Sequence, residues 1–384
     1  MPCNKLSNIS IVLFIWLLCG SNMTGQVTLL VEGLPENTPS TDDIYVSGDF
    51  EGWTGGQDAY RLAFDQGQHK IILPGSKETI HFKFTRGSWE SVESDTEGRQ
   101  LDNRSFSFTK KMDTLKVNIA QWADLTPKKS TASSRVHLLD NSFDMSPLDK
   151  KRRVWIYLPA SYDTSSKNYP VVYMHDGQNL FDQSLSYSGE WEVDETLDRL
   201  ENSHELELII VGIDNGGSER IDEYTPWEIP EYPSKQQGDT YIRFIKENLK
   251  PFIDKNYRTQ SNNEQTAIMG SSLGGLISYY AALQYPETFG KAGIFSPSFE
   301  MVKKSLDFAK DHGNLKDSKI YFMAGNKESE QMVAKMSQTI QVMIAAGFPE
   351  NNIKSKVVKE GEHNEKLWRE EFEPAIIWLF ETGQ

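Results

Sequence analysis

The five residues GSSLG at Gly270–Gly274 are the most informative part of the sequence, because they join the apolar run Thr266–Met269 to the helix-forming run Leu276–Ala282. This order predicts a strand, a tight turn and a helix, with Ser272 at the apex of the turn. A G-x-S-x-G serine in such a turn projects its hydroxyl out of the sheet, and the flanking glycines avoid the clash that a Cβ atom would cause. Short Gly/Ser patterns also arise by chance in loops, so Ser272 needs partners elsewhere in the chain before it indicates chemistry.

The composition is that of a globular protein. Of 384 residues, 38% are apolar and 11% are aromatic, which is enough for two domains with their own cores. The formal net charge of −15 disfavours nucleic acid and anionic membrane surfaces as partners, since both would repel the chain. We therefore expect a neutral or cationic partner, or none. No phosphate-binding glycine loop appears, which leaves nucleotide chemistry without support.

The N-terminus has the layout of a secretory signal peptide. Lys5 precedes the apolar run Ile9–Leu18, and small and polar residues follow it. We expect residues 1–25 to be removed by cleavage near Gly25 or Gln26, and the mature protein to be periplasmic or extracellular. No later run approaches about 20 apolar residues, so no membrane span is expected.

Both cysteines, Cys3 and Cys19, lie within the expected signal peptide. A lipid anchor on Cys19 is disfavoured, because bulky Leu18 stands where lipoprotein signals carry a small residue. The mature chain would then have no disulfide, no thiolate nucleophile and no cysteine metal site. The stability of the mature chain must therefore come from the burial of apolar side chains.

The rest of the chain divides into a β-rich part and an alternating part. Short β-prone runs separated by Gly, Asp and Asn clusters in residues 26–125 predict a small antiparallel, immunoglobulin-like β-sandwich. Residues 126–134 are polar and too poor in apolar side chains to fold alone, which indicates a linker. In residues 135–384, strands alternate with helices, which predicts a mostly parallel sheet covered on both faces. The eight expected strands are Val136–Leu139, Arg153–Leu158, Pro170–Met174, Leu206–Ile213, Thr266–Met269, Lys291–Phe295, Lys319–Met323 and Ile353–Val358.

A serine in such a turn is a poor nucleophile without a base, which we expect in a loop after the last strand of the sheet. His363 meets this condition, because it lies between the last expected strand and a terminal helix. An acid that orients the base should lie between serine and histidine in the chain. Glu328, in the loop after the penultimate strand, is our choice. Glu330 stays open as an alternative, because loop boundaries predicted from sequence slip by about 2 residues.

Two backbone amides are expected to stabilise a developing oxyanion. Leu273 directly follows the nucleophile and supplies one of them; the turn Met174–Asn179 supplies the other, with Gln178 as the best choice. Taken alone, His175-Asp176 in this turn would suggest a metal site or a second triad. We rate that lower, because no cluster of histidines or carboxylates follows at ligand spacing. No metal or organic cofactor is expected.

The segment Asn215–Gln237 carries aromatic residues and prolines at the edge of the sheet where substrate loops lie. Arg220, Tyr224 and Trp227 are candidates for substrate contacts. A rigid, self-packed loop in which Arg220 pairs with Glu223 is an equal alternative.

Several motifs of the catalytic half carry a family resemblance. They are YMHDGQNLFD at Tyr173–Asp182, VGIDN at Val211–Asn215, Arg220 with Glu223-Tyr224, the turn at Ser272, and His363 with Glu365 and Trp368. From about Arg153 onward the chain resembles the esterase D and enterochelin-esterase-like group of α/β-hydrolases. The resemblance implies the α/β-hydrolase fold and a serine esterase with a Ser-acid-His triad. The group includes feruloyl, acetylxylan and siderophore esterases, formylglutathione hydrolases and mycolyltransferases. Its acid is commonly Asp, so Glu328 is a departure.

The β-rich part carries a looser resemblance. GDFEGW at Gly48–Trp53, KFTRGSWE at Lys83–Glu90 and Asn103-Arg104 are similar to starch-binding and glycogen-binding modules. Exposed tryptophans in such modules stack on sugar rings. This makes Trp89 the candidate for sugar binding and Trp53 a candidate for the core. Many such modules attached to esterases serve as spacers, so sugar binding stays open.

These features together predict an exported serine carboxylesterase in which His363 deprotonates Ser272 and an acyl-enzyme forms. Feruloyl, acetyl or similar esters on polysaccharides are the expected substrates. Two alternatives stay open: hydrolysis of a trilactone siderophore of the enterobactin type, and a glycan-binding protein with an inactive hydrolase domain. Acyl transfer to a sugar instead of water also stays open.

Overall fold

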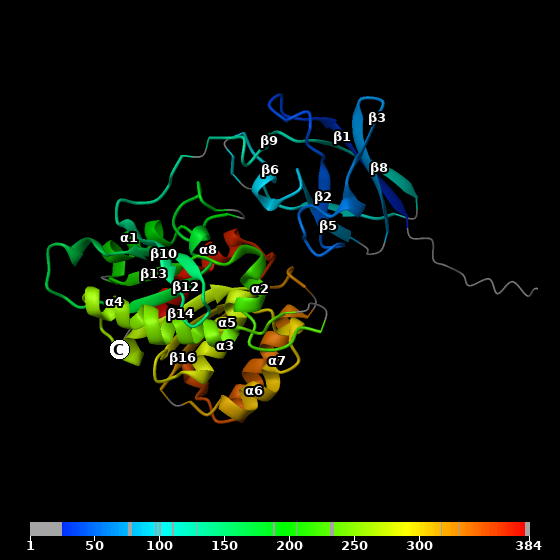
Figure 1. Ribbon diagram of the computed structural model, residues 1–384. Coiled ribbons are helices and arrows are strands. Elements are labelled where there is room, and N and C mark those ends of the chain that lie inside the picture. Colours follow the sequence, from blue (N-terminus) through cyan, green and yellow to red (C-terminus); the bar gives the residue numbers. More distant parts are fainter. Residues whose placement is uncertain are drawn as a thin grey trace, which may run out of the picture. The chain divides into compact units, whose positions relative to one another are not determined.

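The computed structural model describes residues 25–75, 79–96, 98–99, 101–109, 111–127, 129–186, 189–204, 206–230, 234–315, 317–329 and 331–380. Residues 1–24 of the expected signal peptide and the alternative acid Glu330 lie outside this part. The chain divides after Thr126 into two compact units (Figure 1), each described by itself below. Within the described residues, no helix combines the length and the apolar character that a membrane crossing needs.

The N-terminal unit is a β-sandwich. One sheet has the strand order β3-β4-β1-β8 and the other has the order β2-β5-β7, while β6 and β9 form a separate short pair. The strands are β1 (Gln26–Gly33), β2 (Tyr45–Gly48), β3 (Ala63–Asp65), β4 (Gln68–Pro74), β5 (Thr79–Thr85), β6 (Glu93–Ser94), β7 (Arg104–Ser107), β8 (Met112–Asn118) and β9 (Gln121–Trp122). Both sheets contribute to one core, with Leu29 from β1 and Phe82 from β5 among its fully buried side chains.

One pairing in this unit differs from the antiparallel sandwich that we expected. β1 and β8 run parallel to each other, with Leu29 opposite Leu115. A parallel pair cannot be closed by a hairpin and needs a long connection, and here nearly the whole unit separates the two strands. Local turn signals therefore could not indicate this pairing.

The second unit contains an eight-stranded sheet with the order β10-β11-β13-β12-β14-β15-β16-β17. Its strands are β10 (Val136–Asp144), β11 (Lys151–Tyr157), β12 (Val171–His175), β13 (Ile209–Ile213), β14 (Thr266–Ser271), β15 (Lys291–Phe295), β16 (Lys319–Gly325) and β17 (Ile353–Val358). The pairs β10–β11 and β11–β13 are antiparallel, and from β13 to β17 all pairs are parallel. The predicted eight-stranded, mostly parallel sheet is confirmed.

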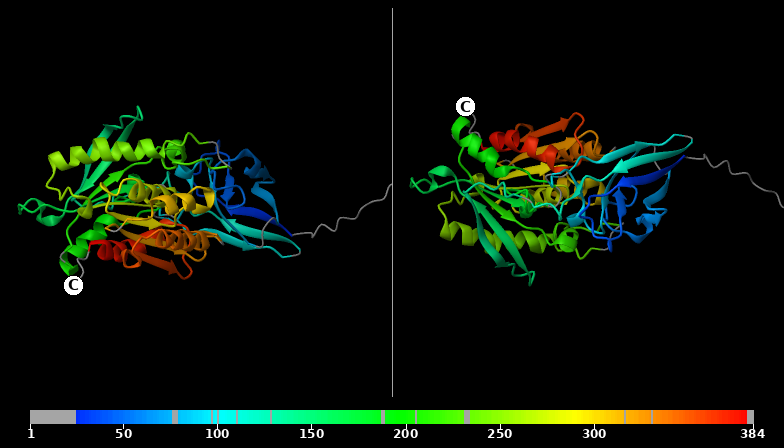
Figure 2. Two further views of the ribbon diagram at one scale, coloured as in Figure 1. Left: turned by 90° about the horizontal axis from the view of Figure 1, so that it is seen from below. Right: turned by 90° about the horizontal axis from the view of Figure 1, so that it is seen from above.

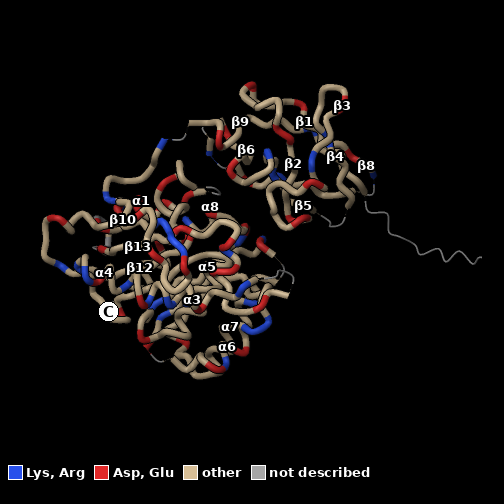
Figure 3. Tube along the Cα trace, viewed as in Figure 1, with Lys and Arg blue, Asp and Glu red and all other residues tan. Residues whose placement is uncertain are grey.

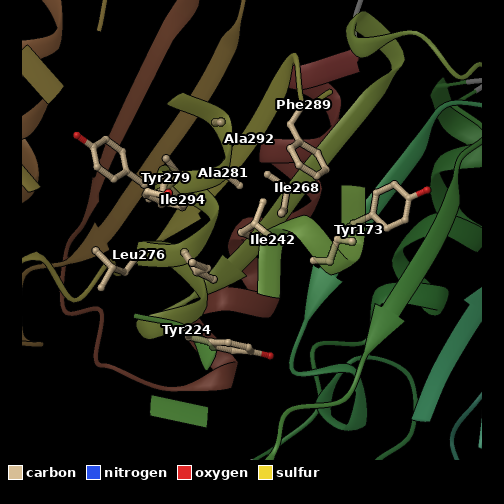
Figure 4. Close-up of a cluster of buried hydrophobic side chains, with 14 of the residues drawn as sticks. Tyr173, Tyr224, Ile242, Ile268, Leu276, Tyr279, Ala281, Phe289, Ala292 and Ile294 are labelled. Carbon is tan, nitrogen blue, oxygen red and sulfur yellow. The ribbon is translucent and has the colours of Figure 1, made fainter. Parts of the chain in front are cut away.

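Helices cover both faces of this sheet, as Figures 1 and 2 show. They are α1 (Val193–His204), α2 (Arg220–Glu223), α3 (Gly238–Phe244), α4 (Lys250–Asn256), α5 (Leu273–Gln284), α6 (Ser305–His312), α7 (Met332–Ala345) and α8 (Glu365–Phe380), and a π-helical turn, Ile245–Leu249, joins α3 to α4. α1 and α8 pack on the face to which Val172 and Met174 point. α3 to α7 pack on the other face, where the buried cluster includes Tyr173 of β12, Ile268 of β14 and Leu276 of α5 (Figure 4).

Burial on both faces explains why the central strands are continuous apolar runs and not alternating ones. All five residues of β12 and of β13 are buried, as expected for a parallel sheet between two helical layers. Figure 3 shows acidic and basic residues interspersed along the Cα trace of this unit, so the acidic residues are not gathered in one block of the chain. The loops that follow β12, β14, β15, β16 and β17 all leave the sheet at its carboxyl edge, where α/β proteins place their sites.

Candidate active site

Ser272 occupies the sharp turn between β14 and α5. Its backbone angles, φ 59° and ψ −123°, lie in a region that residues with a side chain rarely adopt and that is typical of strained functional positions. A Cβ atom at Gly270 would lie 3.0 Å from the backbone of Gly274, and one at Gly275 would lie 2.6 Å from the carbonyl oxygen of Phe295. The turn is therefore closed only because glycines stand at these positions.

Glu328 and His363 are brought together by loops that lie 35 positions apart in the chain. His363 Nδ1 lies 2.6 Å from Glu328 Oε2, so the ring donates its Nδ1 proton to the carboxylate. The Glu328 side chain is only 1% exposed, whereas that of His363 is 36% exposed. An oriented, buried carboxylate behind a half-open imidazole is the arrangement that a general base requires.

Ser296 and Trp368 hold the acid in place. Ser296 directly follows β15, and its hydroxyl donates to Glu328 Oε1 at 2.7 Å while it accepts a hydrogen bond from Trp368 Nε1 at 2.8 Å. The backbone amide of Gly325 also donates to Glu328 Oε1. The Trp368 ring meets the His363 ring edge-on, with centroids 5.0 Å apart. Sequence reasoning missed Ser296; its place after a central parallel strand was the one available signal.

The surroundings of His363 raise its pKa above the usual 6.5. Burial lowers this pKa, but the hydrogen bond and the negative charge of Glu328 outweigh burial, and the charges of Glu300 and Glu365 add to the increase. The imidazolium that forms when His363 takes a proton is thereby stabilised.

The two expected oxyanion donors lie at the same edge of the sheet. Leu273 is the first residue of α5, so its amide has no partner within the helix and the positive end of the helix dipole lies beside it. Gln178 lies in a buried turn, Gly177–Asn179, directly after β12, and its side-chain oxygen accepts the amide proton of Asn215 at 3.1 Å. β12 and β14 are neighbours in the sheet, which places both donors near Ser272.

Arg220 ties the Gln178 turn to the serine turn. Its guanidinium donates to both oxygens of Asp176, at 2.7 and 2.8 Å, and reaches the carbonyl of Ser271 at 3.4 Å. Burial raises the pKa of Asp176, but the charge and hydrogen bonds of Arg220 lower this pKa by a larger amount. The net pKa of Asp176 is therefore below its usual value, and the carboxylate stays ionised. The expected pairing of Arg220 with Glu223 is wrong, because Glu223 is bound by Arg152 at 2.6 Å.

The aromatic residues of the same loop are buried. The Tyr224 side chain is 0% exposed, and its hydroxyl accepts the amide proton of Asp176 at 3.2 Å. Trp227 is also buried and packs edge-on against Tyr280 and Phe308, with centroids 5.6 and 5.1 Å away. The prediction that Tyr224 and Trp227 contact substrate is therefore not supported, and the self-packed loop is what the structure contains.

His175 belongs to no group of three or more potential metal ligands among the described residues. Its Nδ1 atom lies 2.9 Å from the Tyr241 hydroxyl, and burial lowers its pKa to about 3. The ring is thus neutral and packs between Tyr224 and Tyr241, with centroids 5.2 and 5.5 Å away.

In the N-terminal unit, Trp89 packs against Trp53. The indole N–H of Trp89 donates to the carbonyl oxygen of Trp53 at 2.8 Å, and the ring centroids are 5.9 Å apart. Both side chains are half-buried, so Trp53 does not belong to the core as we expected. Its φ of 58° places it in a turn at the surface of the sandwich.

The fold and the serine turn define an α/β-hydrolase. Residues 146–379 match the Esterase family model, described as "Putative esterase", and the chain belongs to this family. It is a carboxylic ester hydrolase, as its esterase-named relatives also indicate.

The chain is similar to two proteins of Bacillus subtilis and one of Xylanibacter ruminicola. YbbA of Bacillus subtilis is 30% identical over 246 residues, covering 60% of this chain and 92% of YbbA. Ferri-bacillibactin esterase BesA of Bacillus subtilis is 26% identical, covering 56% of this chain and 71% of BesA. An endo-1,4-beta-xylanase/feruloyl esterase of Xylanibacter ruminicola is 26% identical, covering 59% of this chain and 29% of that protein.

Among solved structures, the enterobactin esterase FES from Shigella flexneri has a TM-score of 0.55 and 16% identity. The likeness covers 92% of this chain and 93% of the Shigella chain, so it extends beyond the α/β unit into the N-terminal β-sandwich. At this identity the likeness shows the fold alone.

The Ser296 hydroxyl is expected to matter for rate more than for substrate affinity. Ser296→Ala removes the hydrogen bonds to Glu328 and from Trp368. We expect kcat to fall by about 10-fold to 100-fold with KM nearly unchanged, since one hydrogen bond to a charged group contributes about 1.5–3 kcal/mol. Trp368→Phe keeps an aromatic side chain but removes the indole N–H. Steady-state kinetics of both variants and of the double variant check this: the two losses should be less than additive. Fully additive losses would contradict a shared network.

Proposed function

We propose that the chain is a secreted serine carboxylesterase that works through an acyl-enzyme on Ser272. The observation that carries this proposal is the Glu328–His363 pair, 2.6 Å apart, at the sheet edge where the strained turn presents Ser272. β14, β15, β16 and β17 are successive neighbours in the sheet. The loops that bear serine, acid and base therefore begin side by side.

In the proposed reaction, His363 Nε2 takes the hydroxyl proton of Ser272 while Oγ attacks the ester carbonyl. The carbonyl electron pair moves onto oxygen, where the amides of Leu273 and Gln178 receive the negative charge. Collapse of this intermediate breaks the ester bond, and the alcohol leaves with the proton from His363. Water, deprotonated by the same histidine, then attacks the acyl-enzyme and releases the acid. The Glu328 carboxylate, which contacts His363 Nδ1, stabilises the imidazolium in both halves of the reaction.

Acyl esters on polysaccharides, feruloyl or acetyl, are the substrates that we propose. The relative from Xylanibacter ruminicola that is named a xylanase and feruloyl esterase supports this class, and so does the signal-peptide layout of residues 1–25. The charge of −15 also favours a neutral ester. Sugar contact in the N-terminal unit would involve the half-buried pair of Trp53 and Trp89, since sugar rings stack on indole faces.

A trilactone siderophore is the second candidate substrate. It is favoured by the similarity to ferri-bacillibactin esterase BesA and by the two-unit likeness to an enterobactin esterase. A ferric tris-catecholate is an anion, however, and would need free cationic groups at the site. Arg220, whose guanidinium reaches the carbonyl of Ser271, is already paired with the Asp176 carboxylate. This favours the neutral glycan ester.

The test is a substrate panel with the purified protein: p-nitrophenyl acetate, methyl ferulate, acetylated xylan and ferric enterobactin. We expect hydrolysis of the p-nitrophenyl ester and of methyl ferulate or acetylated xylan, each abolished by Ser272→Ala. Hydrolysis of the siderophore without hydrolysis of either glycan-type ester would replace the first candidate by the second. Absence of hydrolysis of every ester would favour a glycan-binding protein with an inactive hydrolase domain.

A further inference from the structure

Three carboxylates that the triad does not use converge next to α1. Glu190 lies in the loop before this helix, and Asp194 and Glu195 lie in its first turn. One oxygen atom from each carboxylate lies within 4.8 Å of the other two. No sequence motif predicts a metal site here, because the convergence of the three carboxylates depends on how the loop enters the helix.

Two oxygen atoms of this cluster are buried without a hydrogen-bond partner. They are Asp194 Oδ1 and Glu195 Oε2, and Asp194 is 0% exposed. The other oxygens are engaged: both Glu190 oxygens lie 2.9 Å from the Thr131 hydroxyl, and Asp194 Oδ2 accepts the amide proton of Ser133 at 2.7 Å. A buried carboxylate oxygen without a partner is costly, so the two oxygens point to a missing positive charge, either a proton shared between Asp194 and Glu195 or a bound cation.

The protein itself supplies no such charge among its described ion pairs. Arg369, the nearest basic side chain by contact, binds the Glu192 carboxylate at 2.9 Å and the backbone carbonyl of Glu190 at 3.3 Å. Burial, followed by mutual repulsion, raises the pKa of Glu190 and of Glu195 to about 8. Burial likewise raises the pKa of Asp194 to about 6.

We propose that Glu190, Asp194 and Glu195 bind one hard divalent cation, with Ca²⁺ as the best match. All donors are oxygen atoms, which is the ligand set that Ca²⁺ prefers. Ca²⁺ accepts irregular sets of oxygen ligands at roughly 2.3–2.6 Å, whereas Mg²⁺ requires shorter bonds and a stricter octahedron. The Thr131 hydroxyl, 2.9 Å from the Glu190 oxygens, offers a further oxygen.

Such an ion would fasten the segment 130–133 to the catalytic unit. Ser130 already donates to Asp182 at 2.7 Å, and Thr131 and Ser133 contact two of the three ligand residues. Trp191, next to Glu190 in the chain, stacks on Phe295 with centroids 5.4 Å apart and lies 5.9 Å from the Trp368 ring, which contacts His363. The cation would thus restrict the motion of Trp191 and of the aromatic side chains between it and His363.

Terbium luminescence tests this site directly, because buried Trp191 can sensitise a bound lanthanide ion. The full chain is stripped with EDTA, and Tb³⁺ is added at pH 8, where the carboxylates release their protons more readily. We expect one saturable site from which Ca²⁺ displaces Tb³⁺, and a rise in Tm on addition of Ca²⁺. Asp194→Asn should weaken binding at least tenfold, while the matched control Glu192→Gln, a neighbour outside the cluster, should not.

Two results would overturn the proposal. One is the absence of Ca²⁺-displaceable luminescence together with an unchanged Tm, which would mean that the free oxygens share a proton. The other is equal binding by Asp194→Asn and Glu192→Gln. Folding of Asp194→Asn is checked by circular dichroism, and we expect it to fold without the ion because it removes a buried charge. Hydrolysis of p-nitrophenyl acetate, measured in parallel, reports on the esterase separately.

Discussion

Ser272→Ala is expected to lower kcat for p-nitrophenyl acetate by about 10⁴-fold to 10⁶-fold, the range found when a triad nucleophile is removed. The reason is that, in the proposed mechanism, the acyl-enzyme forms on the Ser272 hydroxyl, which alanine lacks. Alanine keeps the Cβ atom at φ 59°, so the backbone strain is unchanged and the fold should persist. Steady-state kinetics, with circular dichroism as the check on folding, measure the effect.

Ser298 provides the matched control for this experiment. Its hydroxyl lies 3.3 Å from Ser272 Oγ, so it is the serine that could replace the nucleophile if the assignment were wrong. We expect Ser298→Ala to lose less than about tenfold in kcat. Labelling with a fluorophosphonate, followed by peptide mass spectrometry, should place the adduct on Ser272. An adduct on Ser298, or full activity of Ser272→Ala, would reverse the two roles.

Features with a local signal were predictable from the sequence. The strands β15 and β17 begin and end where the apolar runs predict, at Lys291–Phe295 and Ile353–Val358. The G-x-S-x-G pattern predicted the position of the turn, because the backbone there is too closely packed for side chains at the glycine positions. The acid Glu328 could be chosen because chain order and strand ends confine it to one loop.

Features that depend on distant contacts were not predictable. Arg220 pairs with Asp176, 44 positions away, and its near neighbour Glu223 is bound instead by Arg152. Local spacing favoured the wrong partner. Tyr224 was expected at a pocket because of its aromatic, proline-rich loop, yet large aromatic side chains are buried whenever a core is within reach. The same holds for Asp194, whose cluster arises only when the loop before α1 is folded.

Glu328→Gln is the second change for which we expect a large effect, a loss of about 10³-fold to 10⁴-fold in kcat. The amide can donate to His363 Nδ1 where the carboxylate accepts, which favours the tautomer with its proton on Nε2, and that tautomer cannot act as a base toward Ser272. The charge that stabilises the imidazolium is lost as well. Kinetics across pH 5 to 9 measure both losses.

The pH profile distinguishes two possible roles of Glu328: orienting the His363 ring, or only placing a negative charge near it. Because the base must be neutral, kcat/KM falls as pH drops through the pKa of His363, which lies above 6.5 in the wild type. Glu328→Gln removes the main causes of the raised pKa and leaves burial, which lowers it, so the acid limb should move to lower pH. Glu300→Gln is the matched control, because it removes another charge that raises the pKa of His363. The acid limb of its kcat/KM profile should therefore also move to lower pH. Its plateau kcat should stay within about twofold of the wild-type value, since no hydrogen bond to His363 is lost. If both variants kept the wild-type plateau, Glu328 would be only a charge near the base, and the acid of the triad would have to be sought elsewhere, with Glu330 as the next residue to change.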